Sequence, residues 1–336
     1  MIGQAEIKII KGGDASIVEN DQKGWISAIG GLELRMYGIK IITDQSKITI
    51  PIIYIEDSNS LLELNTITFS EIKLSPKDNP KGIVHINADN SQFVAQNCIF
   101  EEINIEGSSG NAIRLENNAN SRITATITNC QFNNIKSIGD SNGQGGSALF
   151  AKLRDQSSLI IDNNCQFIQC ISNKGNGGAL FIDIDFESEF EFKINDGLIK
   201  DCHALSEQSG SENSLSGYGG GIFLTGNGDY NAQSEKLDLH GMKILDNSAS
   251  NSGQSLFVAM TQLKELCRYG INGQYVKGDY DDQTSNLNEL QGIPLDFNNF
   301  KDLSSKQIQQ QQNHLQYYWS QIVILTGAIA LNQKGL

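Results

Sequence analysis

"NCQFNNIKSIGDSNGQGGSALF" occupies residues 129–150, and "NCQFIQCISNKGNGGALF" occupies residues 164–181. The second stretch repeats the first about thirty-five residues later, with a shorter middle section. Self-similarity at a period of 20 to 50 residues is typical of chains built from stacked structural repeats. The repeat therefore indicates the fold class before any local pattern is considered.

Further copies of the phrase lie on both sides of this pair. They are "NCIFEEINIEGSSGNAIRL" (97–115), "KDCHALSEQSGSENSLSGYGGGIFL" (200–224) and "LDNSASNSGQSLFV" (245–258). The phenylalanine of the phrase recurs at positions 69, 100, 132 and 167. The length varies mainly in the polar loop before the glycines. Insertions confined to one loop are expected when the core of each repeat must stay in register.

The repeats read as strands. In "SRITATITNCQF" (121–132), isoleucine and alanine alternate with threonine, which is the two-residue period of a strand. We therefore predict one solenoid coil per repeat, with Phe100, Phe132 and Phe167 in a single inward column. The asparagines of the Asn-Cys corner are predicted to form a hydrogen-bonded ladder, namely Asn97, Asn129 and Asn164. Glycine suits the later corner because it accepts positive φ, and the Leu and Phe of "GALF" are predicted to fill the interior.

These motifs resemble a known group of proteins. "GGSALF", "GGALF" and "GGGIF", each paired with a phrase like "NCQF", are similar to the GGA-I and F-x-x-N repeats of polymorphic outer-membrane proteins. They also resemble the wider group of pectin-lyase-like parallel β-helices, over roughly residues 30–260. The resemblance implies an all-β fold: a right-handed, single-stranded parallel β-helix solenoid with a short, partly helical C-terminal cap. It also implies a cell-surface or extracellular setting.

The change in character after residue 265 predicts three regions. Residues 1–265 are predicted to form the parallel β-helix, with repeats clearest over 60–260. Residues 266–303 are predicted to be an irregular acidic capping region. Residues 304–336 are predicted to be a C-terminal helix or cap, beginning at Ser304 or Ser305, or the start of a truncated further segment. The apolar run at 322–331 is about half of the ~20 residues that a membrane-spanning helix needs.

Composition excludes one class of partner and limits the chemistry. The net charge of −14 over 336 residues argues against nucleic acid, whose phosphates require a basic face. None of the six cysteines forms a C-x-x-C pair, so a zinc site is not indicated. Three of the cysteines directly follow an asparagine of the repeat. We therefore predict buried, reduced cysteines stacked from coil to coil.

An acidic stripe is the candidate metal site. "FIDIDFESEFEF" (181–192) alternates acids with apolar residues, so one continuous strand would place the acids on one face. The candidate ligands are Asp183, Asp185, Glu187 and Glu189, and calcium is the ion that prefers carboxylate oxygens. The alternative is a solvated face screened by salt. A turn near Ser188 would divide the stripe and weaken the calcium hypothesis.

Catalytic signatures are sparse. Three arginines are possible bases for a polysaccharide lyase, but no acidic triad accompanies them at coil spacing: Arg114, Arg122 and Arg154. The four histidines have no recurring partner and are interpreted as surface or loop residues: His85, His203, His240 and His314.

Three functions from different classes remain open. The favoured one is a non-catalytic structural or adhesion scaffold, within a larger cell-surface protein, that binds a protein or carbohydrate ligand. A membrane is a partner only through a longer parent chain. The alternatives are a carbohydrate-active lyase or hydrolase and a calcium-dependent adhesion module.

Overall fold

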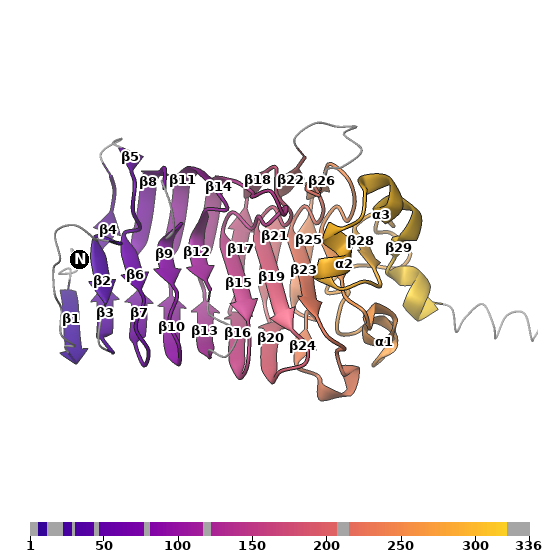
Figure 1. The fold of residues 1–336 in the computed structure, drawn as a ribbon, viewed down its shortest axis with the longest axis horizontal. Coiled ribbons are helices and arrows are strands. Elements are labelled where there is room, and N and C mark those ends of the chain that lie inside the picture. Colours follow the sequence, from indigo (N-terminus) through magenta and orange to yellow (C-terminus); the bar gives the residue numbers. More distant parts are fainter. Residues whose placement is uncertain are drawn as a thin grey trace, which may run out of the picture.

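The structure is a computed structural model, and it describes residues 6–11, 23–28, 31–43, 47–76, 81–116, 122–206 and 215–320. These residues form an all-β parallel solenoid of about seven turns, with short helices near the C-terminal end (Figure 1). The predicted all-β parallel solenoid with a partly helical cap is therefore confirmed.

Three sheets run along the solenoid. Sheet A contains β1 (Glu6–Lys11), β3 (Glu33–Tyr37), β7 (Leu61–Asn65), β10 (Ser91–Gln96), β13 (Ile123–Thr128), β16 (Ser157–Asp162), β20 (Phe190–Ile194) and β24 (Leu237–Asp238). Sheet B contains β2 (Ile26–Ala28), β6 (Ile53–Ile55), β9 (Gly82–Ile86), β12 (Asn111–Leu115), β15 (Leu149–Leu153), β19 (Leu180–Asp185), β23 (Ile222–Asn227), β27 (Leu256–Ala259), β28 (Leu290–Ile293) and β29 (Asn313–His314). Sheet C contains β4 (Lys40–Ile41), β5 (Lys47–Ile48), β8 (Thr68–Leu74), β11 (Ile99–Ser108), β14 (Gln131–Ile138), β17 (Cys165–Ile168), β18 (Ile171–Asn173), β21 (Gly197–Lys200), β22 (His203–Leu205), β25 (Met242–Leu245) and β26 (Ser248–Ala249).

Each turn passes from sheet A to sheet C and then to sheet B, as in the succession β7, β8 and β9 before β10. Within the described residues, neighbouring strands pair in parallel except at the two ends. There β1 pairs antiparallel with β3, and β29 pairs antiparallel with β28. The regular parallel register places equivalent residues of successive coils directly beside one another.

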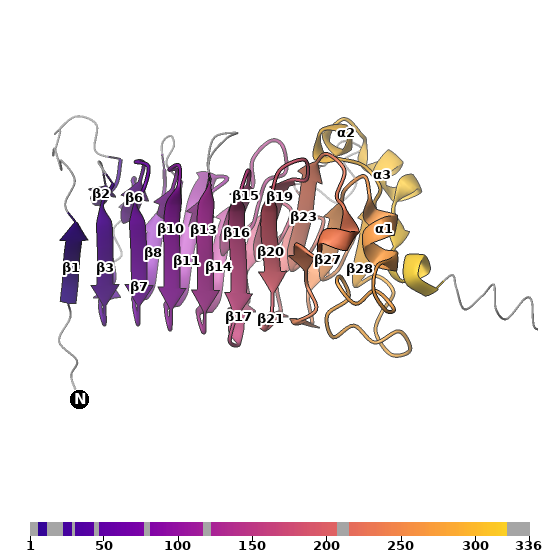
Figure 2. The same ribbon diagram turned by 90° about the horizontal axis from the view of Figure 1, so that it is seen from below.

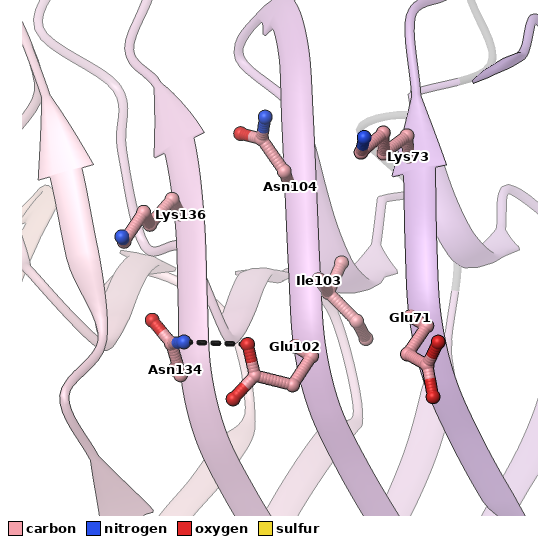
Figure 3. Close-up of a pocket in the computed structure, with 7 residues that line it drawn as sticks. All are labelled: Glu71, Lys73, Glu102, Ile103, Asn104, Asn134 and Lys136. Carbon is pink, nitrogen blue, oxygen red and sulfur yellow. Dashed lines mark hydrogen bonds between the residues drawn. The ribbon is translucent and has the colours of Figure 1, made fainter. Parts of the chain in front are cut away.

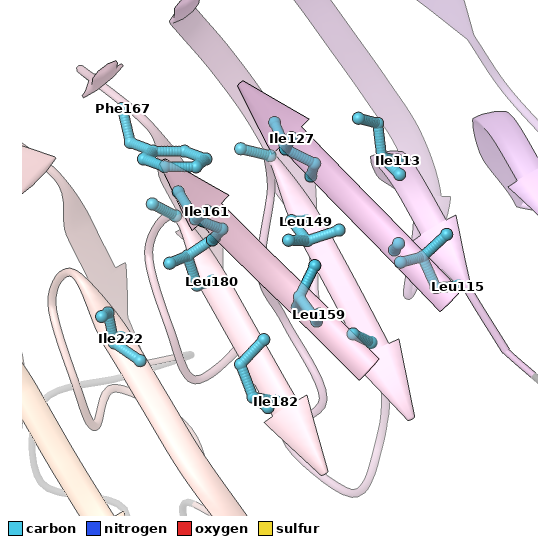
Figure 4. Packing of buried hydrophobic residues seen from close by; sticks show 14 of the residues in the cluster. Ile113, Leu115, Ile127, Leu149, Leu159, Ile161, Phe167, Leu180, Ile182 and Ile222 are labelled. Atoms are coloured by element: carbon cyan, nitrogen blue, oxygen red, sulfur yellow. The ribbon is translucent and has the colours of Figure 1, made fainter. Parts of the chain in front are cut away.

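The inward phenylalanines form one column. Phe69, Phe100, Phe132 and Phe167 stack with ring centroids 4.8, 4.9 and 4.7 Å apart. Sheet B supplies the opposite wall of the same core. There Ile113, Leu149, Leu180 and Ile222 lie in register on successive strands (Figure 4). The predicted single column is therefore confirmed.

The corner between sheets A and C is built on asparagine. Asn97, Asn129 and Asn164 have φ values of 54°, 51° and 59°, a left-handed region that asparagine tolerates better than most residues. The Nδ2 of Asn129 donates to the Oδ1 of Asn97 at 2.6 Å. The predicted ladder is confirmed for this pair.

The cysteines that follow these asparagines stack inside the core. The backbone nitrogen of Cys98 lies 3.4 Å from the Sγ of Cys130, and that of Cys130 lies 3.4 Å from the Sγ of Cys165. All six cysteines are buried and none forms a disulfide. The structure therefore has the predicted column of buried thiols.

Two glycines before "GALF" show why this corner needs them. Gly177 has a φ of +69°, and a Cβ on Gly178 would lie 2.0 Å from the carbonyl oxygen of Gly220 in the next coil. A side chain at Gly178 would thus collide with a neighbouring backbone. Close approach of the coils, as well as positive φ, requires glycine here.

The phenylalanines of "GALF" point outward, so the prediction that they fill the interior is wrong. Phe150, Phe181, Phe223 and Phe257 stack on the outer face of sheet B, in a second apolar cluster. Adjacent residues of a strand face opposite sides, and Leu180 takes the inward position beside Phe181. The C-terminal segment covers this outer cluster with Phe297, Phe300 and Ile308.

In the described part of the C-terminal cap lie α1 (Leu263–Arg268), α2 (Phe297–Lys301) and α3 (Ser305–Gln311), and residues 316–320 are helical as well. The short helix η1 (Ala232–Ser234) precedes β24. Figure 2 shows the cap helices gathered at the C-terminal end of the solenoid, beside the last strands of sheet B. Ser304 and Gln307 form a capping box at the start of α3. The predicted helix start is thus confirmed at Ser304, but α3 ends at Gln311. The apolar run at 322–331 lies outside the described residues.

The region predicted as irregular and acidic, 266–303, contains β28, which extends sheet B by one strand. In the described part of the chain, no helix has the length and apolar character needed to span a membrane.

Candidate functional site

The acidic stripe is not one strand. β19 ends at Asp185, a turn follows, and β20 begins at Phe190. Glu187 lies on the turn, where its backbone nitrogen donates to the Oδ1 of Asp185 at 3.2 Å. Of the two arrangements left open for 181–192, the structure has the one with a turn near Ser188, which divides the stripe, because the coil needs a corner between sheets B and A.

Asp183 already has a cationic partner. The guanidinium of Arg154 contacts both carboxylate oxygens of Asp183, at 2.9 and 3.4 Å, and its carbonyl oxygen at 3.0 Å. Among the residues that the structure describes, no three His, Cys, Asp or Glu side chains are grouped to hold a metal ion. The calcium hypothesis for Asp183, Asp185, Glu187 and Glu189 stays a prediction, which calorimetry with millimolar calcium would test.

A second ion-pair network lies on the outer face of sheet B. The Nε of Arg114 and the Nζ of Lys152 each lie 2.6 Å from a different carboxylate oxygen of Glu116. The guanidinium of Arg114 also lies 3.9 Å from the ring centre of Phe150. Burial opposes ionisation of Glu116, but the two cations outweigh it and lower the pKa of this carboxyl to about 2. The three charges thus satisfy one another.

His85 lies beside this network on β9. Its ring meets Tyr54 edge to face at 5.3 Å, and its Nδ1 accepts from the backbone nitrogen of Lys81 at 3.1 Å. Its Nε2 is buried without a hydrogen-bond partner. Burial, with the nearby charge of Arg114, lowers the pKa of His85 to about 3. The imidazole is therefore neutral at physiological pH, and the interpretation of His85 as a surface or loop residue is wrong.

We expect His85 to make stability depend on pH. Its pKa is about 3 when folded and about 6.5 when unfolded, so only the unfolded chain gains its proton between these values. Stability therefore falls as the pH drops below 6.5, by roughly 2 to 3 kcal/mol at pH 4.5. Urea unfolding of the wild type and of His85→Gln at pH 6.5 and at pH 4.5 checks this. The variant should lose most of that pH dependence. An equal change in the free energy of unfolding with pH in both proteins would contradict the expectation.

Sequence reasoning missed Glu116 and Lys152, although a signal for them exists. Both follow the small residue of the glycine corner at the same offset, as Asp183 does, so the coil brings all three positions to adjacent strands of sheet B. Arg114 and Phe150 occupy the neighbouring outward row. Aligning each repeat on its corner would have grouped these charges.

Arg122 joins a different group of residues, at the corner between sheets B and A. It lines an open hollow of about 390 Å³ together with Glu189, Glu191 and Lys236. Glu191 is paired with Lys193 at 2.8 Å. The structure thus brings Arg122 near Glu189, whereas Arg114 and Arg154 do not line this hollow.

The remaining histidines lie at three separate places. His240 follows β24, with its Nδ1 2.8 Å from Asp238. His314 lies on β29 and contacts the carbonyl oxygen of Leu287 at 2.9 Å. His203 lies on β22, in sheet C.

Sheet C carries two parallel rows of side chains, which are polar except at Ile171. The first row, which we call the corner row, consists of residues with positive φ, one per coil: Glu71, Glu102, Asn134, Gln169, Asp201 and Asp246. The second, which we call the outer row, lies two residues further along each strand: Lys73, Asn104, Lys136, Ile171, His203 and Ser248. Since the strands pair in register, both rows follow the solenoid axis.

A furrow of about 470 Å³ lies between the two rows on β8, β11 and β14 (Figure 3). Ile103, which is buried, also lines this furrow. The Nδ2 of Asn134 donates to Glu102 at 2.7 Å, which holds the corner row in place. In the described part of the chain, no hydrogen bond or ion pair engages the side chains at the other polar positions: Glu71, Lys73, Asn104 and Lys136. The furrow is thus an open surface whose exposed donors and acceptors at these four positions have no protein partner in the described part of the chain.

Comparison with known proteins gives no family for this chain, since no family model, curated protein or solved structure matches it. The candidate sites are therefore the ion-pair network on sheet B and the furrow on sheet C.

Proposed function

We propose that this protein is a binding scaffold that holds an extended ligand along the furrow of sheet C without cleaving its chain. The observation that carries the proposal is the set of four unpaired polar side chains lining one concavity. On sheet B, by contrast, Arg114, Lys152 and Glu116 already satisfy one another. Charged groups without a partner are available to a ligand, whereas paired and buried ones must first break their contacts.

The charges of the furrow favour an uncharged ligand. Lys73 and Lys136 offer donors from the outer row, and Glu71 and Glu102 offer acceptors from the corner row. The two cations and two anions balance, so a strongly anionic or cationic polymer would meet a like charge. Each hydroxyl group of a neutral glycan can both donate and accept. A neutral polysaccharide lying along the axis therefore matches this arrangement.

A peptide fits the same furrow less well. Extended peptides usually add to an exposed strand edge or insert side chains into apolar pockets. The strands of this furrow, β8, β11 and β14, already have neighbours, and the lining is polar apart from Ile103. The favoured ligand is therefore carbohydrate, and a protein ligand is the other outcome of a binding test.

The setting that we propose is the cell surface, as part of a larger protein. Support comes from the resemblance of the corner motifs to polymorphic outer-membrane-protein repeats and pectin-lyase-like β-helices. A membrane would then be reached only through a longer parent chain. The net charge of −14 continues to disfavour nucleic acid as a ligand.

Removing both lysines of the furrow should weaken binding. Screening on a panel of neutral and anionic polysaccharides should identify a neutral glycan, whose affinity calorimetry then measures. For Lys73→Ala/Lys136→Ala we expect a loss of about tenfold or more, since two hydrogen bonds from charged donors are removed. Lys264→Ala/Lys306→Ala, which changes the same charge in the cap, should bind as the wild type does. Equal affinity of the two double variants, or selective binding of polyanions, would contradict the proposal.

A carbohydrate-active enzyme is the second candidate, favoured by the Arg114–Glu116–Lys152 network on sheet B. Its glutamate and lysine are residue types that act as general acids and bases in other enzymes. Incubation with pectate, alginate and related polyuronides, with and without calcium, distinguishes the two functions. Sustained release of unsaturated or reducing ends, lost in Glu116→Gln, would replace the scaffold with the enzyme.

A further inference from the structure

Near the C-terminal end of sheet C, Ser248 and His203 of the outer row lie close to Asp201 of the corner row. The Oγ of Ser248 lies 2.7 Å from the Nδ1 of His203, and the Nε2 of His203 lies 3.4 Å from an Oδ1 oxygen of Asp201. His203 and Ser248 are register partners on β22 and β26. The three residues come from two coils, so the solenoid winding assembles them.

We propose that Ser248 is an activated nucleophile that accepts acyl groups from esters, with His203 as its general base and Asp201 as a positioning residue. A serine hydroxyl needs an adjacent base to attack a carbonyl, and a third group usually orients that base. Ser248, His203 and Asp201 provide these three parts at contact distance.

The imidazole uses its two nitrogens in the reverse of the familiar serine-protease order. In those proteases the serine contacts Nε2 and the aspartate contacts Nδ1. A neutral imidazole has one donor and one acceptor nitrogen, and either nitrogen can take either part. With the proton on Nε2, which lies 3.4 Å from the Oδ1 of Asp201, the Nδ1 of His203 is free to accept the proton of Ser248.

The aspartate is held from two sides. Asp201 occupies a corner position with a φ of 54°, which fixes its direction relative to β22. The Nε2 of Gln169 in the preceding coil donates to its other carboxylate oxygen at 3.2 Å. Asp201 therefore presents one oxygen to Gln169 and the other to His203.

The site is also open to a substrate. The side chains of His203 and Asp201 are 29% and 40% exposed, and Ser248 is partly exposed on the same surface. A small ester can reach this surface without unfolding the coil.

The reaction balances with an ester and water as reactants. The Oγ of Ser248 bonds to the acyl carbon while its proton passes to the Nδ1 of His203. The bond to the alcohol then breaks, and the alcohol leaves with that proton. Water, deprotonated by His203, attacks the acyl-serine and releases the carboxylic acid and Ser248. An ester-linked substituent on a chain held in the furrow is a suitable substrate, since His203 and Lys136 belong to one row.

Fluorophosphonate labelling of the full chain tests the nucleophile directly. The probe forms a bond from phosphorus to the Oγ of Ser248 and loses fluoride, and peptide mass spectrometry locates the adduct. We expect the label on Ser248, none there in Ser248→Ala, and a labelling rate lower by about 100-fold or more in His203→Gln. Ser250→Ala, a neighbouring serine without a histidine contact, should label as the wild type does.

Two further measurements separate activation from structure. Melting temperatures show whether Ser248→Ala and His203→Gln stay folded, and hydrolysis of p-nitrophenyl acetate should follow the labelling rates. Asp201→Asn should slow labelling while Asp201→Glu restores part of it, which a merely structural role would not produce. Folded wild type without label at Ser248, or equal labelling of wild type and His203→Gln, would overturn the inference. The furrow variant Lys73→Ala/Lys136→Ala should keep full labelling, so a failure of the binding proposal is seen separately.

Discussion

Phe132→Ala is expected to destabilise the solenoid by about 3 to 5 kcal/mol, the usual range for removing a fully buried aromatic ring. Phe132 is completely buried and stacks between Phe100 and Phe167 at 4.9 and 4.7 Å. Loss of the ring would leave a cavity in the middle of the column. The backbone hydrogen bonds between strands fix the spacing of the coils, so the neighbouring coils cannot close this cavity. Urea unfolding followed by circular dichroism measures the change.

Two variants serve as controls for this prediction. Phe132→Leu keeps most of the buried volume and should be markedly less destabilised than Phe132→Ala. Thr126→Ala changes the outer face of β13 and should stay within about 0.5 kcal/mol of the wild type. If Phe132→Ala unfolded at the same urea concentration as Thr126→Ala, the single inward column would be wrong.

Phe300→Ala is expected to release the C-terminal cap from sheet B. The ring of Phe300 is fully buried and lies 5.5 Å from both Tyr218 and Phe223 and 6.0 Å from Phe257. Its removal should cost about 3 to 5 kcal/mol, and that loss falls on the contact between the cap and the solenoid. Limited proteolysis should therefore cut near residues 295–312 much faster, while the coils before residue 260 stay resistant.

Lys301→Ala is the matched control, because this half-buried side chain follows Phe300 on α2 and lies over the ring of Phe297, outside the aromatic cluster that Phe300 fills. We expect its cleavage pattern to match that of the wild type. Cleavage of Phe300→Ala spread evenly over the chain would show that the outer cluster does not hold the cap separately.

The two apolar clusters explain why the faces of the solenoid differ. The aromatic row of sheet B needs a cover, which α2 and α3 provide over Phe181, Phe223 and Phe257. On β8, β11 and β14 of sheet C, the equivalent outward positions hold Lys73, Asn104 and Lys136, which remain solvated. A surface of this kind can meet a ligand without first losing a packed apolar contact, which supports the choice of sheet C as the binding face.

The parallel solenoid, the inward phenylalanine column and the asparagine corner followed directly from the sequence. Each depends on a residue that recurs once per coil, and a parallel register must place such residues next to one another. Spacing alone therefore determined that Phe100, Phe132 and Phe167 stack, and that Asn97 contacts Asn129.

Only the tertiary structure decided which side chains point outward from the solenoid and which residues they contact. The outward turn of Phe181 depends on where the glycine corner places the first residue of β19, and one residue of register reverses every side chain. The division of the acidic stripe depends on a corner that no glycine or asparagine marks. The contact between His203 and Ser248 joins residues 45 positions apart, across a loop whose length differs from that of every other repeat. Local sequence patterns predict how many residues form one coil. The position of each corner and the length of each loop determine which side chains become neighbours.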